Sequence, residues 1–341
     1  MAIAWRRNPP KPPAMRVVLL IALIWLLVPH YAGLSPNPRL NHQVPFSLTP
    51  VAIRRDGGNR VGQLRFLRGY RLASADPAFG GWSSLLVEGD RFTLLSDGGE
   101  LIRFRLDDTG RMSAPEMFSL PTGPGTGWTK DDRDSESMVR DPATGRLWVG
   151  FENWNAIWRY APGFARAERH VEPPAMQQWP PNGGPETMAR LADGRFLVIA
   201  EQVRDTAPPS VREALLFDRD PTETRHPPLR FSYMPPPGGF DPSDATQLPD
   251  GRIILLNRRL HLPDGFEVAV SIIDPRAIRP GATVKGSEIA RFAGDVLHDN
   301  YEGIAVGADA GGPVIWIVSD DNQNMFQQSL LLAFRLDPAT R

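Results

Sequence analysis

A unit of 50 to 58 residues recurs five times along the chain, and it restricts the fold more than any other feature of the sequence. Each unit has a short apolar strand with an acidic or small residue near its start, then a turn, then a strongly apolar strand that ends in a polar residue. The turn is Asp-Gly-Arg at residues 193–195 and 250–252, and Asp-Gly between two apolar runs predicts a tight hairpin. Periods near 50 residues are typical of β-propellers. The equivalent first-strand positions are Ser84, Glu136, Glu186, Asp244 and Glu302.

The segments that follow each strand pair predict a complete propeller blade. We expect third strands at places such as residues 101–106 and fourth strands at places such as residues 229–233, and four antiparallel strands make one blade. The prediction is therefore an all-β propeller of five four-stranded blades, or of six if residues 44–55 add strands of their own. A β-sandwich also has regularly spaced strands, but it would not explain a matched period together with matched acidic positions.

The two ends of the repeat predict how the ring closes. The last unit reaches its third strand at residues 330–336 and has no fourth, whereas residues 63–67, just before the first unit, have the pattern of a fourth strand. An N-terminal strand that completes the last blade would close the ring and remove its exposed edges.

The first residues of the chain predict export. Arg6, Arg7, Lys11 and Arg16 precede an unbroken apolar run of 12 residues at 17–28. A membrane-spanning helix needs about 20 such residues, whereas the core of a signal peptide needs about 7–15. We expect residues 1–32 to be a signal peptide or an uncleaved N-terminal anchor, residues 33–59 an exported linker or extra strands, and residues 60–341 the propeller. Met15 is an alternative start of the chain.

Composition excludes several kinds of site. The chain has no cysteine, which rules out disulfides, thiolate nucleophiles and cysteine-based metal sites. Its net charge is −1, so it offers no broad basic surface for nucleic acid, and we expect no nucleic-acid partner. It has no P-loop, no Rossmann glycine pattern and no Gly-x-Ser-x-Gly elbow. We expect a monomer that touches a membrane only through its N-terminal segment, if that segment is retained.

The recurring acidic residues of the first strands predict a polar site at the centre of the ring. The first strand of each blade lines the central channel, and its side chains alternate between packing and lumen. Four carboxylates that converge there repel one another and must bind a cation, take up protons or pair with arginine. Oxygen ligands in a ring suit Ca²⁺, or Mg²⁺ with waters; a solvated strand end that binds no metal is the alternative. The predicted first-strand ligands are Glu136, Glu186, Asp244 and Glu302, and Ser84 takes this place in the first unit.

A second set of polar residues ends the second strands. Asp97, Glu152, Glu201 and Asp320 hold this place, and the fourth unit has Arg258 there. Arg258 would neutralise the ring. Asp134 joins the set of predicted ligands because it lies on the same face of an extended chain as Glu136.

The aromatic and imidazole side chains add weaker expectations. Trp82 and Trp128 lie in glycine-rich stretches and would line a binding mouth, whereas Trp148, Trp158 and Trp316 lie inside apolar strands and are expected in the core. The six histidines show no metal-ligand spacing. No catalytic residue is assigned; the candidates to test are Arg258 and His298, which lies close to the fifth unit's first strand.

Several of these motifs resemble the phytase-like family, described as the esterase-like activity of phytase. The resemblance covers roughly residues 60–336, and its most specific motifs lie at residues 300–304 and 319–322. It implies a propeller fold, export from a bacterial cell, and hydrolysis of phosphate or carboxylic esters. A cleaved signal peptide would leave the chain in the periplasm or outside the cell, and an uncleaved anchor would hold it at the inner membrane. Propeller phytases are similar in fold and use Ca²⁺ in an acidic channel. This chain departs from them in having only three lysines, Ser84 in the first unit and Arg258 in the fourth.

Two functions follow as expectations. The first is a divalent-metal-dependent hydrolase of small-molecule phosphate or carboxylic esters, with water as the nucleophile and Ca²⁺, or else Mg²⁺, as the cofactor. The second is a propeller of the cell envelope that binds a ligand or protein without catalysis and holds a structural Ca²⁺, or no metal. The sequence identifies no substrate.

Overall fold

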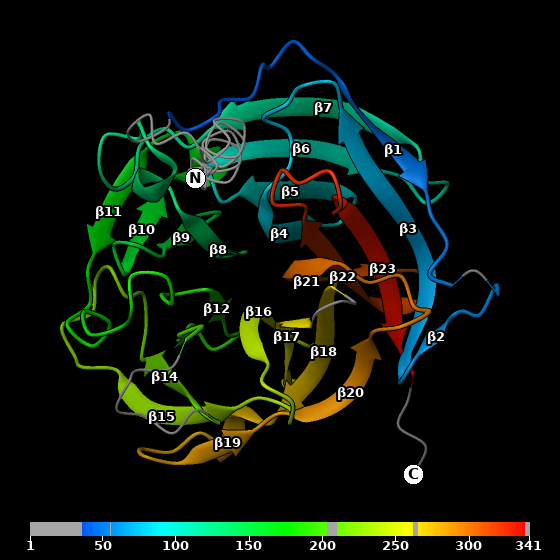
Figure 1. Ribbon diagram of the computed structural model, residues 1–341. Helices are drawn as coiled ribbons and strands as arrows, with labels where there is room; N and C mark the ends of the chain where they lie inside the picture. Colours follow the sequence, from blue (N-terminus) through cyan, green and yellow to red (C-terminus); the bar gives the residue numbers. More distant parts are fainter. Residues whose placement is uncertain (1–35, 55, 203–209, 262–264, 338–341) are drawn as a thin grey trace, which may run out of the picture. The chain divides into compact units, whose positions relative to one another are not determined.

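Five sheets form a ring in the computed structural model, and each sheet is one blade of a propeller (Figure 1). The structure describes residues 36–54, 56–202, 210–261 and 265–337; the expected signal peptide or anchor at residues 1–32 lies outside them. The all-β prediction is confirmed, since the only helices among the described residues are three short 3₁₀ turns: η1 (Lys130–Asp132), η2 (Pro162–Phe164) and η3 (Pro275–Ala277). No helix in the described ranges is long and apolar enough to cross a membrane.

Each blade presents its first strand to the centre of the ring, and the following strands are added outward (Figure 1). Blade 1 consists of β4 (Trp82–Glu88), β5 (Arg91–Ser96), β6 (Glu100–Leu106) and β7 (Met112–Ser119). Blade 2 consists of β8 (Ser135–Arg140), β9 (Leu147–Phe151), β10 (Ala156–Tyr160) and β11 (Ala167–Val171). Blade 3 consists of β12 (Thr187–Arg190), β13 (Phe196–Ile199), β14 (Arg212–Phe217) and β15 (Leu229–Met234). Blade 4 consists of β16 (Asp241–Gln247), β17 (Ile253–His261), β18 (Gly265–Ile273) and β20 (Ser287–Phe292).

Blade 5 closes the ring with both ends of the repeat region. Its inner strands are β21 (Asn300–Asp309), β22 (Gly312–Asp320) and β23 (Leu330–Leu336), and β23 pairs antiparallel with β3 (Leu64–Ser74). Closure by an N-terminal strand is thus confirmed. Two further strands, β1 (Phe46–Pro50) and β2 (Arg60–Val61), pair with β3. Strand β1, the strand found within the range 44–55, therefore widens the last blade instead of starting a sixth, and the propeller has five blades.

One strand was not predicted. Strand β19 (Thr283–Lys285) pairs in parallel with β15 at the outer edge of blade 3, although it belongs to the connection between β18 and β20 of blade 4. Because it covers an edge that would otherwise expose unpaired backbone groups, it protects blade 3 and ties it to blade 4.

The predicted hairpin turns are confirmed. Gly194 and Gly251 have φ of +89° and +90°, which residues with a side chain rarely adopt. In each turn the preceding aspartate accepts a hydrogen bond from the backbone N–H two residues later, at 3.1 Å for Asp193 and 3.0 Å for Asp250. These turns all lie at the end of the ring where the first strands stop and the second strands begin.

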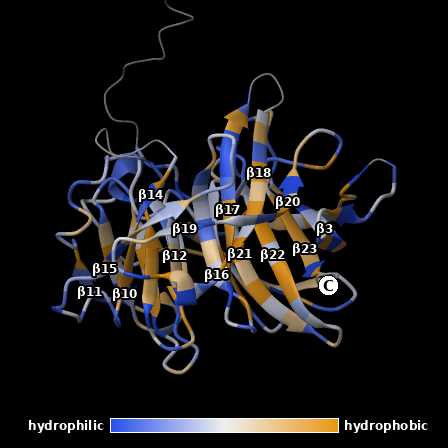
Figure 2. Ribbon diagram, turned by 90° about the horizontal axis from the view of Figure 1, so that it is seen from below, coloured by the Kyte–Doolittle hydropathy of each residue, from blue (hydrophilic) through white to orange (hydrophobic). Residues whose placement is uncertain are grey.

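The core lies between neighbouring blades. Trp148 and Trp316 are each 3% exposed, as predicted, Trp158 is only partly buried, and Trp82 is fully buried. Trp82 therefore packs in the core and does not line a mouth. Figure 2 shows apolar strand segments in the body of the propeller and polar residues at many of its loops. Each fully buried large apolar side chain contributes about 1.5–3 kcal/mol to folding, so the faces between blades account for much of the stability of the ring.

Candidate functional site

An acidic cavity lies at the centre of the ring, at the end where the first strands begin and the second strands stop. We call this end the mouth face. The cavity has a volume of about 310 Å³, and every one of its fifteen lining residues is polar. Nine are carboxylic acids and two are cations. The lining residues are Asp97, Lys130, Asp131, Asp134, Glu136, Glu152, Asn153, Asn182, Glu186, Glu201, Gln202, Arg258, Glu302, Asp320 and Asn322.

The structure brings together most of the residues that the sequence predicted as ligands. Those that line the cavity are Asp134, Glu136, Glu152, Glu186, Glu201, Glu302 and Asp320, together with Arg258. They come from the starts of the first strands and the ends of the second strands, which meet at the mouth face because neighbouring strands of a blade are antiparallel.

Asp244 does not line the cavity, because it stands one residue after the bulge that four of the first strands share, a bulge that Ser243 occupies in β16. In β8 and β21 the glutamate itself occupies the bulge, and the next residue pairs with the second strand: Ser137 with Gly150 and Gly303 with Val318. In β16 the residue that pairs there, with Leu256, is Asp244. Since a shift of one residue turns a side chain to the opposite face of a strand, the predicted ring of four aligned acids has three members.

Asp244 instead joins two blades. Its carboxyl oxygens accept hydrogen bonds from the backbone N–H groups of Ala245 at 2.8 Å and of Ile304, in blade 5, at 2.9 Å. Burial raises its pKa well above the usual value, and the two hydrogen bonds oppose that shift. Ser84 is its counterpart in blade 1, where it pairs with Leu95.

Arg258 holds one side of the cavity. Its Nη2 lies 3.2 Å from Oε1 of Glu186 and 3.1 Å from Oε1 of Glu201, and its Nη1 lies 3.1 Å from Oε1 of Glu302. Burial opposes its charge, but the carboxylates outweigh burial and raise the pKa of Arg258 well above its usual value. The expected neutralising role of this arginine is in agreement with these contacts.

Lys130 is the second cation, and it was not predicted from the sequence. Its Nζ lies 2.6 Å from Oδ2 of Asp97 and 3.9 Å from Oδ1 of Asp134, and its side chain is 52% exposed. The signal was present, because Lys130 is one of only three lysines and directly precedes the acidic run at residues 131–136. The amides of Asn153, Asn182 and Gln202 were also missed, since isolated amides carry no pattern.

Two groups of carboxylates are close enough to share a cation. Asp134, Glu136 and Glu152 offer oxygens that all lie within 4.8 Å of one another, and so do Glu152, Glu186 and Glu201. Glu152 is common to both groups. Within the described ranges no ion pair joins Glu136 or Glu152 to a lysine or arginine, whereas Glu186 and Glu201 both contact Arg258.

The ionisation of these acids reflects their crowding. Burial, and then repulsion from Glu186 and Asp134, raises the pKa of Glu136 well above its usual value. Burial, and then repulsion from Asp134 and Glu201, raises the pKa of Glu152 to about 9. Such groups ionise at neutral pH only if a positive charge compensates them. Buried carboxylate oxygens without a cationic partner are a donor set that fits Ca²⁺ or Mg²⁺.

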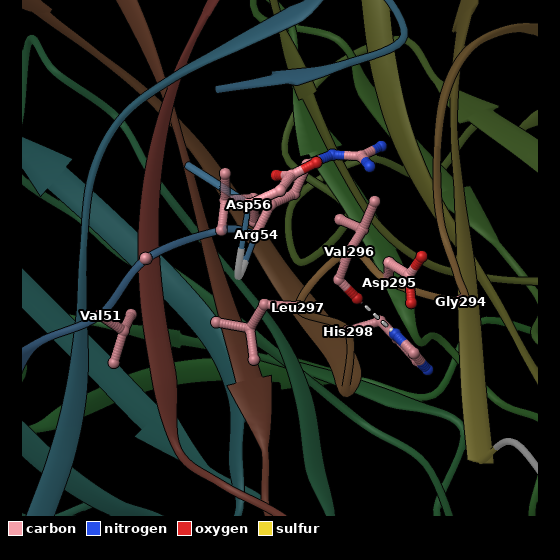
Figure 3. A pocket seen from close by; sticks show the side chains of 10 residues that line it. Val51, Arg54, Asp56, Gly294, Asp295, Val296, Leu297 and His298 are labelled. Carbon is pink, nitrogen blue, oxygen red and sulfur yellow. Dashed lines mark hydrogen bonds between the residues drawn. The ribbon is translucent and has the colours of Figure 1, made fainter. Parts of the chain in front are cut away.

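His298, a candidate acid or base, lies elsewhere. It lines a separate cavity of about 730 Å³ between residues 51–54 with Asp56 on one side and residues 294–298 on the other, and none of the nine carboxylic acids of the acidic cavity lines that space. Figure 3 shows its imidazole beside Val296, and its Nδ1–H donates to the Val296 carbonyl at 2.6 Å. Asp56 and Asp295 also line this cavity, but apolar side chains such as Leu297 make up much of its wall.

Comparison with known proteins gives one family match. The family model described as "Phytase-like: Esterase-like activity of phytase" matches residues 77–323. No curated protein matches the chain. One solved structure, a putative 6-phosphogluconolactonase from Bacteroides uniformis, aligns with 76% of this chain and 71% of its own length at 15% identity, with a TM-score of 0.38. An alignment at that level bears on neither mechanism nor substrate.

Proposed function

The chain belongs to the phytase-like family, and from this premise we propose that it is an exported, divalent-cation-dependent hydrolase of phosphate or carboxylic esters that acts at the acidic cavity. One observation carries the proposal. Nine carboxylic acids and two cations line a single cavity, and one group of three acids, Asp134, Glu136 and Glu152, has its oxygens within 4.8 Å of one another.

The best cation position is this group of three. Glu136 and Glu152 are each 7% exposed, and Asp134 is 8% exposed. A buried carboxylate without a compensating charge costs several kcal/mol of folding free energy. A cation that the three acids share would reduce that cost. Glu152 could also share a second cation with Glu186 and Glu201, but there Arg258 already provides a positive charge.

Side chains of the cavity account for the remaining tasks of a hydrolase. A bound divalent cation would supply Lewis-acid polarisation of the substrate oxygen and a water of lowered pKa. The half-exposed ammonium of Lys130 stands at the mouth, where it would attract an anionic substrate and orient it. Arg258 fixes the carboxylates of Glu186, Glu201 and Glu302 through its three contacts. Because every lining residue is polar, the polar, scissile part of a substrate is the part that would enter.

The alternative is a non-catalytic propeller of the cell envelope with a structural Ca²⁺. One observation favours it. The carboxylates of the second group come from different blades, since Glu152 follows β9 of blade 2 and Glu186 and Glu201 flank the strands of blade 3. A cation held there would join two blades, which is a structural task whether or not a substrate is turned over.

A single set of assays separates the two functions. The full chain and its Glu136→Gln variant would be tested on p-nitrophenyl phosphate and p-nitrophenyl acetate with Ca²⁺, Mg²⁺ or EDTA. Glu172→Gln is the matched control, because Glu172 is exposed and follows β11 on the outside of blade 2. The hydrolase proposal expects turnover that EDTA and Glu136→Gln abolish and that Glu172→Gln retains.

Two results would count against the hydrolase. If EDTA lowers the melting temperature and neither ester is hydrolysed under any condition, the structural-cation alternative stands in its place. If EDTA changes neither stability nor turnover, the acidic cavity holds no cation that matters, and both forms of the proposal fail.

A further inference from the structure

The five exposed large apolar side chains of the described residues all lie on the mouth face. They are Trp128, Trp154, Leu260, Met325 and Phe326, with exposed fractions of 65%, 43%, 61%, 88% and 86%. Trp128 lies in the connection from β7 to β8, Trp154 between β9 and β10, Leu260 near the end of β17, and the last two between β22 and β23. We call these five side chains the apolar rim.

Each member of the apolar rim lies close in sequence to a residue of the acidic cavity. Trp154 follows Asn153, Trp128 precedes Lys130 by two residues, and Leu260 follows Arg258 by two. Figure 2 shows the β17–β18 hairpin standing above the ends of neighbouring strands. The rim therefore lies beside the mouth, in the connection between blades 1 and 2 and in blades 2, 4 and 5, whereas no large apolar side chain is exposed among the described residues of the opposite end.

The described chain also begins at the mouth face. The backbone N–H of Asn37 donates to the carbonyl of Trp128 at 2.7 Å, and the Asn37 side chain donates to the carbonyl of Gly98. In the sequence, only residues 29–36 separate Asn37 from the apolar run at 17–28. Eight residues of chain reach at most about 28 Å, so an apolar segment retained in a membrane would tether this end of the propeller to the bilayer.

We propose that the mouth face rests on a lipid bilayer, with the apolar rim inserted among the lipid headgroups and the acidic cavity opening toward them. The inference does not depend on catalysis, because it rests on where apolar side chains and the start of the described chain lie. Tryptophan is enriched at membrane interfaces, and the strength of such binding grows with the apolar area buried.

A bilayer fits the apolar rim better than a folded protein partner. Protein interfaces bury a contiguous, shape-matched patch, whereas the rim side chains come from four separate segments in blades 2, 4 and 5 and in the connection between blades 1 and 2. A fluid layer accepts each side chain independently. The expected bilayer surface is zwitterionic, because the nine acids at this face would repel an anionic one.

Single-cysteine labelling tests the orientation, because the chain has no cysteine of its own. An environment-sensitive fluorophore would be placed at Met325→Cys on the rim or at Arg276→Cys in η3, at the opposite end. The two sites are matched in exposure, since Met325 is 88% exposed and the Arg276 side chain is also 88% exposed. The full chain would be reconstituted in phosphatidylcholine vesicles and compared with the same protein in detergent-free buffer.

The proposal expects the label at position 325 to gain intensity and shift to shorter wavelength on vesicles, while the label at position 276 does not respond. A triple variant, Trp128→Ala with Trp154→Ala and Phe326→Ala, should lose the response at 325 and keep its circular dichroism spectrum, since all three side chains are exposed.

Three outcomes would overturn the proposal. Equal responses at the two positions would show that the face has no preferred orientation. A response at 325 that survives the triple variant would assign the contact to the N-terminal segment alone. A response that appears without vesicles and grows with protein concentration would assign the rim to a second copy of the chain.

Discussion

On the side of blades 3 to 5, three cavity carboxylates pair with the guanidinium of Arg258. On the side of blade 2, Asp134, Glu136 and Glu152 lie together, and their one ion pair in the described ranges is the 3.9 Å contact of Asp134 with Lys130. The same repeat position supplies Glu152 to one side and Arg258 to the other. The chain therefore supplies its own counter-charge, Arg258, to the half of the site at blades 3 to 5, which we call the occupied half. The half at blade 2, which we call the open half, needs protons or a cation from solution.

Removal of Arg258 should produce the largest effect, because it takes the internal counter-charge from the occupied half. Arg258→Gln leaves Glu186, Glu201 and Glu302 crowded without a partner, and breaking such a buried pair costs about 3–5 kcal/mol. We expect the free energy of unfolding in EDTA to fall by that amount, and Ca²⁺ to restore part of it because a second cation can then bind. Urea unfolding with and without Ca²⁺ measures both. An equal loss of unfolding free energy with and without Ca²⁺ would mean that the cation cannot replace the positive charge of Arg258.

The shared ligand Glu152 tests the open half. Glu152→Gln removes a carboxylate from both groups of potential ligands, and we expect it to weaken Ca²⁺ binding by more than the roughly 10- to 100-fold that changes around a metal ligand cost. Asp244→Asn is the control, since the sequence aligns Asp244 with the ring but its oxygens accept hydrogen bonds from Ala245 and Ile304. Calorimetric titration of both variants gives the comparison. Comparable losses of affinity would return Asp244 to the set of ligands.

The contrast between these two acids shows where reading the sequence succeeds. The blade count, the closure by an N-terminal strand and most of the cavity residues follow from the period and from polar positions in otherwise apolar strands. These features depend on short stretches of sequence, and each of the five repeats shows them independently. Asp244 was misplaced because it stands one residue later in its strand than Glu136 and Glu302 do: Ser243 holds the bulge position of β16, and Asp244 pairs with Leu256. An alignment of the repeats on their acidic residues hides this offset of one position, which turns the side chain to the other face of the strand.

Lys130 and β19 were not predicted because both lie in connections outside the repeated strands. Lys130 reaches the cavity from η1, in a connection outside the repeated strands, so no periodicity marks it. Strand β19 pairs with β15 across about fifty residues of sequence, and three residues of ordinary composition give no sign of a partner in another blade. What depends on loops and on contacts between blades requires the three-dimensional structure.

The pH dependence of stability should reveal the open half without mutation. The pKa of Glu152 is raised from its usual value to about 9 in the folded protein. A carboxyl group whose pKa is raised by folding contributes its full stabilisation below its pKa in the unfolded chain, which is about 4.3. That contribution is lost as the pH rises through the pKa that the group has in the folded protein. We therefore expect the melting temperature in EDTA to fall steadily between about pH 5 and pH 9.

Calcium should reverse part of this trend, because it binds the deprotonated carboxylates and its binding grows stronger as the pH rises. Differential scanning calorimetry across that pH range, with EDTA or with Ca²⁺, measures the two curves. Parallel curves would show that the cation does not compete with protons for these acids, and that another site accounts for any stabilisation by Ca²⁺.

Lys130 should have the smallest effect on stability and an informative effect on substrates. Its side chain is 52% exposed, whereas that of its partner Asp97 is 13% exposed. An exposed ion pair contributes about 0–1 kcal/mol and breaking a buried one costs about 3–5 kcal/mol, so this partly exposed pair should cost less when Lys130→Met removes it than Arg258→Gln does. As the half-exposed cation of the mouth, however, it would attract an anionic ester and have little influence on a neutral one. We expect Lys130→Met to raise KM for p-nitrophenyl phosphate and to leave KM for p-nitrophenyl acetate unchanged. Equal changes for both esters would mean that Lys130 serves only to pair with Asp97, and that the mouth of the open half does not select by charge.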